Sequence, residues 1–294
     1  MEKIMISKDF YKERPAVKLS DGKTEFLFLP EDGAKLVSFR TKEGKELFVH
    51  NPSENYNRLF LNSEYIDCEC SAFDDMFPTI DPCRINGIEY LDHGEVCRRE
   101  HNCVIEDDAV KFKCYLPKLN ITYSKIASIK DGELSIKYKI ENHNDFDFPY
   151  LWAAHMMFIA EEGARVESVF ENNTDIKVMF GDAPSQDIIN EYHIGDDKKS
   201  YKYYHKQEKS PMKCGIIYPE SNLKVSVEFD GDTVKYFGVW MNIGYLKGLY
   251  NIALEPCTAL YDDPVNAKNG NAESVLKVGE TVEFTMKISY NELK

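Results

Sequence analysis

Apolar and polar residues alternate with a period of two over long stretches of the chain. Residues 134–140 read LSIKYKI and residues 282–290 read VEFTMKISY, so an apolar side chain recurs at every second position. Because successive side chains of a β-strand point to opposite faces of the sheet, this pattern predicts strands with one buried and one solvated face. The alternation therefore indicates a protein built mainly from β-strands.

Turn signals separate these strand-like runs. Asp-Gly pairs occur at 21–22, 32–33, 131–132 and 230–231, and Asn-Gly pairs occur at 86–87 and 269–270. These residue pairs accept the positive φ angles of tight hairpin turns. The segment 121–142 is accordingly predicted to form a hairpin.

Amphipathic helical patterns are scarce. The best candidate is a short segment at 185–192, which Pro184 is placed to start. Many antiparallel strands with few helices predict two sheets packed face to face. No Ser-, Gly- or Pro-rich linker and no fixed-period repeat divides the 294 residues. We therefore expect an all-β protein, a large antiparallel β-sandwich forming one domain over residues 1–294.

The charge balance restricts the class of ligand. The chain has 36 basic and 50 acidic residues, a formal net charge of −14, and no block of lysines or arginines. This balance disfavours nucleic acid and anionic membrane surfaces as partners. A neutral or cationic small molecule fits better.

The amino-terminal segment and the cysteines suggest a compartment. The first 15 residues carry charges throughout and lack an apolar run suited to a signal peptide or a membrane span. We therefore expect a cytoplasmic protein whose eight cysteines are reduced thiols. Cys68 and Cys70 alone are weak evidence for zinc, so no metal site is predicted.

Two of the seven histidines stand out. His93 directly precedes a glycine, which allows close backbone approach, and His155 lies in the aromatic and aliphatic run PYLWAAHMMFI. His155 is either a satisfied core histidine or a desolvated functional one. The other five have polar or turn-like neighbours and are expected at the surface; they are His50, His101, His143, His193 and His205.

Glu255 is the acidic residue with the most unusual position. It ends an apolar strand-like run and stands immediately before Pro256. Desolvation of a carboxylate raises its proton affinity, as a general base requires. The alternative is a strand-end carboxylate bonded to nearby backbone N–H groups.

Several further residues have both a binding and a structural interpretation. Asp74 and Asp75 could bond sugar hydroxyls or face water, and Arg98 could orient a polar ligand or pair with a surface acid. Trp240 could be a core residue or an aromatic platform for a pyranose ring. Sequence signatures of Ser hydrolases, phosphate loops, dinucleotide folds and HExxH metalloenzymes are absent from the sequence. Acid–base catalysis and binding alone are the remaining classes.

Three segments in order resemble the aldose 1-epimerase (galactose mutarotase-like) family. Residues 74–99 (DDMFPTIDPCRINGIEYLDHGEVCRR) resemble its Phe-Pro loop followed by a His-Gly motif. Residues 153–158 (AAHMMF) resemble its His-Pro-Tyr-Phe motif, and residues 251–264 (NIALEPCTALYDDP) resemble its Glu-Pro-x-Thr motif. The order and the all-β pattern between the segments extend the resemblance over nearly the whole chain.

The resemblance implies a function and a role for each matched residue. Glu255 matches the general base that takes the proton from the anomeric hydroxyl, and His155 matches the general acid that protonates the ring oxygen. His93 matches a second histidine that binds the sugar near the reacting centre, and Phe77 would supply an apolar face. The family fold is a large twisted β-sandwich, a supersandwich, with an open sugar cleft. It needs no metal and no organic cofactor.

The same chemistry predicts how the residues should titrate. Ring opening removes one proton and adds another on the same ring, so a carboxylate and an imidazolium must both be within hydrogen-bond reach. A histidine with a pKa near neutrality and a partly buried glutamate suit both directions of the reaction. We therefore expect an isomerase of carbohydrate metabolism that interconverts the α and β anomers of an aldose.

Departures from the family motifs leave two alternatives open. Cys97 stands where an arginine usually follows the His-Gly histidine, and Met156 and Met157 replace Pro-Tyr. A carbohydrate-binding or regulatory protein without turnover is one alternative. A hexose-phosphate mutarotase is the other, with a basic cluster from Arg84, Arg98 and Arg99. Exposed edge strands leave both a monomer and a homodimer open.

Overall fold

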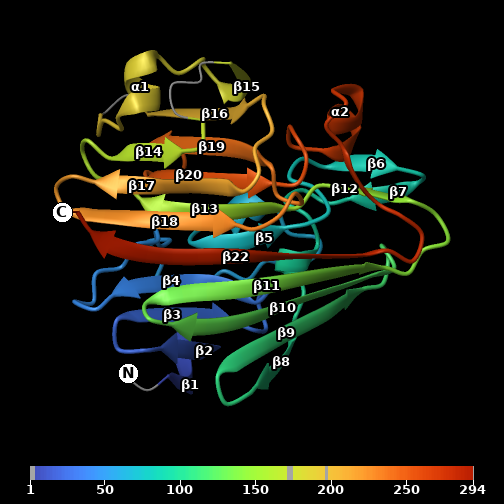
Figure 1. Ribbon diagram of the computed structural model, residues 1–294, viewed down its shortest axis with the longest axis horizontal. Coiled ribbons are helices and arrows are strands. Elements are labelled where there is room, and N and C mark those ends of the chain that lie inside the picture. The colour runs from blue at the N-terminus through green and yellow to red at the C-terminus, as the bar shows by residue number, and fades with distance from the viewer. Residues whose placement is uncertain (1–3, 171–174, 196–197, 294) are drawn as a thin grey trace.

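Two antiparallel sheets make up most of the computed structural model (Figure 1), which describes residues 4–170, 175–195 and 198–293. The ten-stranded sheet of these residues has the strand order β1 (Met5–Tyr11), β2 (Arg14–Ser20), β3 (Thr24–Leu29), β4 (Lys35–Thr41), β5 (Phe73–Met76), β13 (Ala153–Ile159), β20 (Tyr250–Cys257), β19 (Tyr236–Ile243), β16 (Lys199–His205) and β15 (Ile176–Gly181). Strands from both halves of the chain thus meet in its middle, where β13 lies beside β5 and β20.

The second sheet packs across the first. Its eight strands in the described residues follow the order β14 (Arg165–Ser168), β17 (Met212–Tyr218), β18 (Leu223–Phe229), β22 (Thr281–Glu292), β11 (Glu133–Asn142), β10 (Ile121–Lys130), β9 (Ala109–Leu116) and β8 (Asn102–Ile105). One apolar cluster contains residues of both sheets, including Phe28 of β3, Phe158 of β13 and Phe284 of β22. The predicted all-β sandwich is confirmed.

Small elements complete the structure. Two short ribbons pair β6 (Cys83–Ile85) with β7 (Ile88–Tyr90) and β12 (Phe148–Tyr150) with β21 (Ser274–Leu276). The helices are α1 (Gln186–Asn190), α2 (Pro264–Asn269) and the 3₁₀ turns η1 (Tyr65–Asp67) and η2 (Val96–Arg98). In the described part of the chain, no helix has the length and apolar character that crossing a membrane requires.

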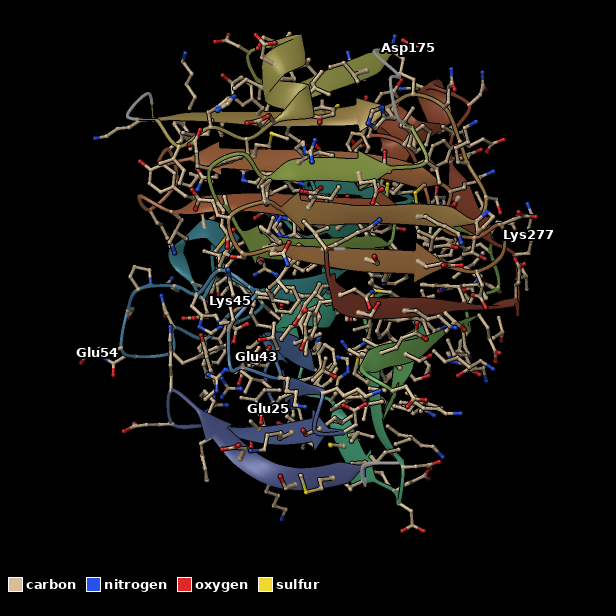
Figure 2. All side chains as sticks on the ribbon, turned by 60° about the vertical axis from the view of Figure 1, so that its left-hand side comes forward. Glu25, Glu43, Lys45, Glu54, Asp175 and Lys277 are labelled. Atoms are coloured by element: carbon tan, nitrogen blue, oxygen red, sulfur yellow. The ribbon has the colours of Figure 1, made fainter. Side chains whose placement is uncertain are left out.

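The strand and turn predictions can be compared directly with the structure. In β11 the predicted apolar positions 134, 136, 138 and 140 are all buried, and β10 and β11 form the predicted hairpin, with Lys130 paired to Glu133. Ser185 caps the predicted short helix by accepting a hydrogen bond from Ile188 N. Charged side chains such as Glu54 and Lys277 lie on segments at the periphery of the sheets (Figure 2).

Two of the predicted hairpin turns are wrong. Asn269-Gly270 ends helix α2, whose start is capped by Asp263. Asp230-Gly231 connects β18 to β19, which belong to different sheets. Gly270 has a φ of −89°, so it does not adopt the left-handed turn conformation, and the pairing of the strands that flank either dipeptide is decided by the packing of the sheets.

Two histidines expected at the surface are instead buried. His101 and His205 are 2% and 5% exposed. The ring of His205 stacks on Phe170 and Phe237, with centroid distances of 4.8 and 5.9 Å. Burial lowers the pKa of His101 to about 3 and that of His205 to about 4, because the charged imidazolium loses its hydration. Both are neutral core residues at neutral pH.

Candidate active site

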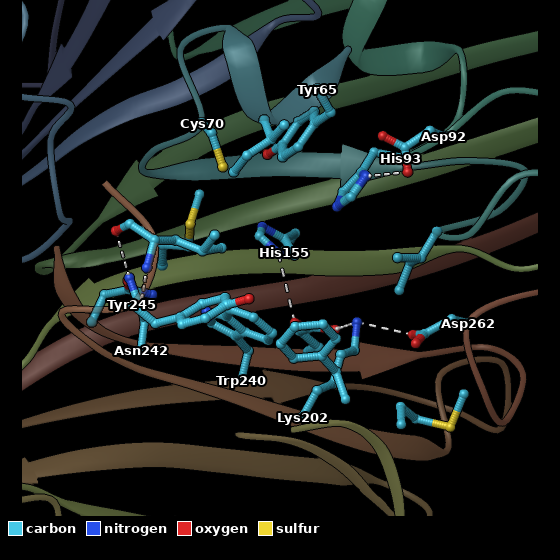
Figure 3. A pocket seen from close by; sticks show the side chains of 18 of the residues that line it. Tyr65, Cys70, Asp92, His93, His155, Lys202, Trp240, Asn242, Tyr245 and Asp262 are labelled. Atoms are coloured by element: carbon cyan, nitrogen blue, oxygen red, sulfur yellow. Dashed lines mark hydrogen bonds and ion pairs between the residues drawn. The ribbon is translucent and has the colours of Figure 1, made fainter. Parts of the chain in front are cut away.

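A cavity of about 420 Å³ lies over the middle strands of the ten-stranded sheet (Figure 3). Strands β13, β20, β19 and β16 supply the polar floor, with His155, Glu255, Trp240 and Lys202 among its residues. Connecting segments supply the opposite wall, which includes Tyr65 and residues 92–93, 245–247 and 249. The sequence predictions His93, His155, Glu255 and Trp240 are therefore brought together in one cavity.

Strand register explains why His155 and Glu255 face each other. Met156 pairs with Leu254 and Ala153 pairs with Cys257, which places His155 opposite Glu255 on the neighbouring strand. Directly opposite residues of antiparallel strands point to the same face of the sheet. His155 Nε2 lies 3.6 Å from Glu255 Oε1.

Glu255 is a fully buried carboxylate with a single close cation. Its exposure is 0%, and Lys202 Nζ lies 2.8 Å from its Oε2 atom. Burial raises the pKa of Glu255, Lys202 opposes the rise, and the nearby charge of Asp262 adds to it. The Oε1 atom, which faces His155, has no hydrogen-bond partner among the residues that the structure describes. This oxygen is available to accept a proton from a ligand.

Lys202 bridges two carboxylates. Its Nζ atom is 2.8 Å from Glu255 and 2.9 Å from Asp262 Oδ1, which also accepts a hydrogen bond of 2.8 Å from Tyr204. Burial alone lowers the pKa of Lys202, but the charges of Asp262 and Glu255 outweigh it and raise the pKa. Lys202 is consequently a fixed cation that stabilises the ionised form of Glu255.

His155 is buried in surroundings that disfavour a positive charge. Burial lowers its pKa well below the ordinary value, and the charges of His93, Lys202 and Lys35 lower it further. Its Nδ1 atom has no hydrogen-bond partner within the described ranges. The expectation of a pKa near neutrality is therefore wrong for His155, because the strand holds the ring beneath the surface and close to cations.

His93 is held by its neighbours in a defined orientation. It has a φ of 57° and is followed by Gly94 with a φ of 76°. Nδ1 of His93 lies 2.9 Å from Asp92 Oδ1, and the ring stacks on Tyr65 at 3.9 Å between centroids. Figure 3 shows the other ring nitrogen turned toward His155 and the cavity. Burial raises the pKa of Asp92, but the hydrogen bond and the charge of His93, together with the charge of Arg98, outweigh burial and lower the pKa.

Gly94 is required by this geometry. A Cβ atom at Gly94 would lie 2.3 Å from the carbonyl oxygen of Phe77. Phe77 itself is 0% exposed and packs against Tyr123, Phe148 and Tyr150. Phe77 therefore supports the His93 segment from the core, and its predicted contact with a sugar does not agree with its placement.

Two predicted sugar-binding acids lie in buried ion pairs. Asp74 Oδ2 accepts hydrogen bonds from Lys35 Nζ at 2.5 Å and from Tyr65 OH at 2.9 Å, so Tyr65 separates it from the cavity. Asp75 points to the opposite face of β5 and pairs with Lys125 Nζ at 2.6 Å between the sheets. Neither residue lines the cavity. The prediction that they contact a ligand disagrees with the structure, because adjacent strand residues face opposite sides and each has its own lysine.

Arg98 is a structural anchor. Its guanidinium donates to four backbone carbonyls, those of Gly94, Phe60, Ser63 and Asp92, at 2.6–2.9 Å. It is 8% exposed and does not line the cavity. Arg98 thus ties the segment of His93 to the segment that leads into Tyr65, and its predicted contact with a ligand does not agree with its placement.

Sequence reasoning missed several lining residues. Lys202 lies in KSYKYYH, a run without an obvious motif, and its partner Asp262 was read only as part of the third motif segment. Tyr65, Asp81 and Asn251 were also missed. The alternation of Ser200, Lys202 and Tyr204 was the one local signal, since it places the lysine on the same face of β16 as a buried tyrosine. No cluster of three or more His, Cys, Asp or Glu side chains suited to a metal occurs in the described residues.

Comparisons with solved structures identify the fold. No protein-family model matches the sequence, and no curated protein does. A candidate aldose 1-epimerase from Klebsiella pneumoniae is similar with a TM-score of 0.78 at 15% identity, over 99% of this chain and 84% of that one. A galactose mutarotase-like protein from Clostridium acetobutylicum is similar with a TM-score of 0.67 at 14% identity, over 100% of both chains.

A third similar structure agrees with these two. A galactose mutarotase related enzyme from Lactobacillus acidophilus has a TM-score of 0.65 at 14% identity, over 95% of this chain and 99% of that one. The chain therefore has the galactose mutarotase-like fold that the three sequence segments indicated. At these identities the likeness concerns the fold.

Proposed function

We propose that the protein is an aldose 1-epimerase-like isomerase that interconverts the α and β anomers of an aldose. The observation that supports this most is the facing pair of His155 and Glu255, 3.6 Å apart in a cavity of about 420 Å³. The cavity lies over the middle strands of the ten-stranded sheet, in a fold shared with aldose 1-epimerase-like structures. A base and a proton donor that both reach one sugar ring are what ring opening requires.

The reaction can be written with this chain's own groups. Glu255 Oε1 takes the proton of the anomeric hydroxyl while a proton is delivered to the ring oxygen, and the C1–O5 bond breaks to give the open-chain aldehyde. Rotation about C1–C2 presents the other face of the aldehyde to the C5 hydroxyl. Closure then returns the first proton to O1 and the second to the donor.

His155 is the proposed donor to the ring oxygen. Its lowered pKa makes its imidazolium a strong acid, although only a minor fraction of the enzyme holds that proton at neutral pH. His93, with Nδ1 held by Asp92, presents its other nitrogen to the cavity and supports the charge that develops near the anomeric centre. Lys202 keeps Glu255 ionised between turnovers.

The charges of the cavity favour a neutral sugar over a hexose phosphate. Four acids line it, Asp81, Asp92, Glu255 and Asp262, against two lysines. Lys202 is already paired with two carboxylates, and Lys247 donates to the carbonyl of Cys68 at 2.8 Å. None of the arginines proposed for a phosphate site, Arg84, Arg98 and Arg99, lines the cavity. A dianionic phosphate would lack the basic cluster that such ligands need.

Anomer exchange measured by proton NMR tests the proposal. Freshly dissolved α-anomers of a panel of aldoses are followed at several pH values with and without the protein. We expect acceleration, and a loss of about 10²–10⁴-fold in Glu255→Gln and His155→Ala. Glu208→Gln is the matched control, since that side chain is 58% exposed and pairs with Lys235 at the surface.

Two outcomes would contradict the proposal. If both active-site variants stayed folded and exchanged anomers at the wild-type rate, the assignment would be wrong. If sugars bound tightly without acceleration, the chain would be a carbohydrate-binding protein that uses the same cavity. A cytoplasmic location and a role in carbohydrate metabolism belong to the same proposal and are supported by the sequence pattern alone.

A further inference from the structure

The cavity extends well beyond the His155–Glu255 pair. Asn251 lies four residues before Glu255 on β20, so the two side chains share one face of the strand about 13 Å apart at their Cα atoms. On the adjacent strand β19, Asn242 pairs with Asn251. Trp240 lies between this pair and the end of the cavity that holds Glu255. All of these residues line the same cavity. The lined surface is therefore longer than one pyranose ring.

Asn251 offers an unused hydrogen-bond donor at the far end. The residue is 2% exposed, and its Nδ2 atom has no hydrogen-bond partner in the described ranges of the chain. Its Oδ1 atom accepts from Asn242 Nδ2 at 3.2 Å, and Asn242 Oδ1 accepts from Leu246 N at 2.9 Å, which fixes the orientation of both amides. A buried donor without a partner is costly, by about 1–3 kcal/mol. A neutral ligand oxygen would satisfy it.

Aromatic side chains surround this end of the cavity. Phe180 lies 5.6 Å from Trp240 and 5.9 Å from Tyr245, measured between ring centroids. Phe180 is 45% exposed and Tyr245 is 50% exposed, although both are large apolar groups. In Figure 3, Trp240, Asn242 and Tyr245 lie together on the side of His155 away from Asp262. Exposed aromatic faces beside a neutral amide donor suit the C–H face and hydroxyls of a sugar ring.

We propose that this end of the cavity is a second sugar subsite, and that the preferred substrate is a reducing disaccharide or longer oligosaccharide. The inference rests on the proposed anomerase function. The reducing ring lies between His155 and Glu255, where its anomeric hydroxyl is free to react. The next ring stacks on the aromatic side chains of Phe180, Trp240 and Tyr245. One of its oxygens accepts a hydrogen bond from Asn251 Nδ2.

Alternative occupants fit this end less well. A phosphate or carboxylate substituent would find no basic cluster here, because Lys247 is the one lysine that lines this end in the described residues, and one of its three N–H donors is used by the carbonyl of Cys68. A purely apolar substituent would leave the amide of Asn251 without an acceptor. A second pyranose satisfies both the amide and the aromatic rings.

The test compares anomer exchange for glucose and galactose with exchange for maltose, cellobiose and lactose. We expect a higher kcat/KM for at least one disaccharide than for either monosaccharide. Phe180→Ala and Asn251→Leu should each lower the ratio of disaccharide to monosaccharide kcat/KM by about 3- to 10-fold. Phe10→Ala should leave the ratio unchanged, because Phe10 is 68% exposed on β1 and does not line the cavity.

Two results would overturn the second subsite. One is a kcat/KM for every disaccharide at or below that for the monosaccharides. The other is an equal loss for both classes of sugar in Phe180→Ala.

Binding to the Glu255→Gln variant separates this inference from the proposed function. Saturation-transfer NMR with the same sugars needs no turnover. Tighter binding of a disaccharide, weakened by Phe180→Ala, supports the subsite even if no sugar is anomerised. Equal binding of both classes contradicts the subsite even if anomerisation is observed.

Discussion

His155 Nε2 and Glu255 Oε1 face each other at 3.6 Å, and burial shifts the pKa values of the two groups in opposite directions. Glu255 titrates above its ordinary value of 4.5 and His155 well below its ordinary value of 6.5. The reaction needs the carboxylate ionised and the imidazole protonated. Activity is therefore lost as pH falls through the raised pKa of Glu255 and as pH rises through the lowered pKa of His155.

The first prediction concerns the pH profile. We expect kcat/KM to follow a narrow bell-shaped pH profile whose maximum lies on the acid side of neutrality. The raised pKa of Glu255 moves the acid limb of the profile to higher pH, and the lowered pKa of His155 moves the alkaline limb to lower pH. The profile of kcat/KM is measured on one aldose over the range in which the protein stays folded. An alkaline limb at or above the ordinary pKa of histidine would contradict this role for His155.

Lys202 should affect both the stability of the protein and the acid limb of the pH profile of kcat/KM. Lys202→Met leaves Glu255 and Asp262 buried without their cation, so we expect a loss of roughly 3–5 kcal/mol in the free energy of unfolding at neutral pH. Lys202 also lowers the pKa of Glu255, so the acid limb of the rate should move to higher pH. Urea unfolding and the pH profile measure the two effects.

A surface lysine provides the comparison for Lys202. Lys213 is 53% exposed and pairs with Glu228 on the neighbouring strand at 3.0 Å. Lys213→Met should change the free energy of unfolding by less than about 1 kcal/mol. An equally small effect in Lys202→Met would show that the buried bridge does not stabilise the protein.

Substitutions at Gly94 and Gly87 distinguish the cost of backbone strain from the cost of a steric clash. Both have positive φ angles, 76° and 79°, but a Cβ atom at Gly94 would lie 2.3 Å from Phe77 O, whereas a Cβ atom at Gly87 would meet nothing within 4 Å. Gly87→Ala should cost about 1–2 kcal/mol from backbone strain alone. Gly94→Ala should cost more and should also slow anomer exchange, because it displaces His93. Denaturant midpoints that were equal for the two variants would exclude the steric contribution.

Arg98 should act as a positioning residue. Arg98→Lys keeps the charge but cannot donate to the same four carbonyls, so we expect a loss of about 1–3 kcal/mol in stability and a lower kcat. Amide hydrogen exchange around residues 60–65 and 92–94 should become faster in this variant. Arg84→Lys, an exposed change on β6, should alter neither property. Unchanged exchange in Arg98→Lys would contradict the anchoring role.

Local pattern was sufficient for much of the fold and part of the site. The alternation of apolar and polar residues predicted β11 and β22, because a strand with one buried and one solvated face has an apolar residue at every second position. Glu255 was identified because a carboxylate at the end of an apolar run is unusual whatever surrounds it. The same reasoning misplaced Asp74 and Arg98, because the sequence around a charged residue is the same whether its partner is a buried group of the protein or a ligand.

The amino-acid sequence by itself determined the strands, most of their turns and the residue types that can exchange protons, since these depend on neighbours in the chain. The order of strands β13, β20, β19 and β16 decided what those residues meet. It set Lys202 beside Glu255 and placed Asn251 at the end of the cavity that Trp240 lines, while the packing of the second sheet supplied Lys125 as the partner of Asp75. Burial, and with it the pKa of His155 and Glu255, follows from packing between residues distant in sequence, which only the tertiary structure specifies.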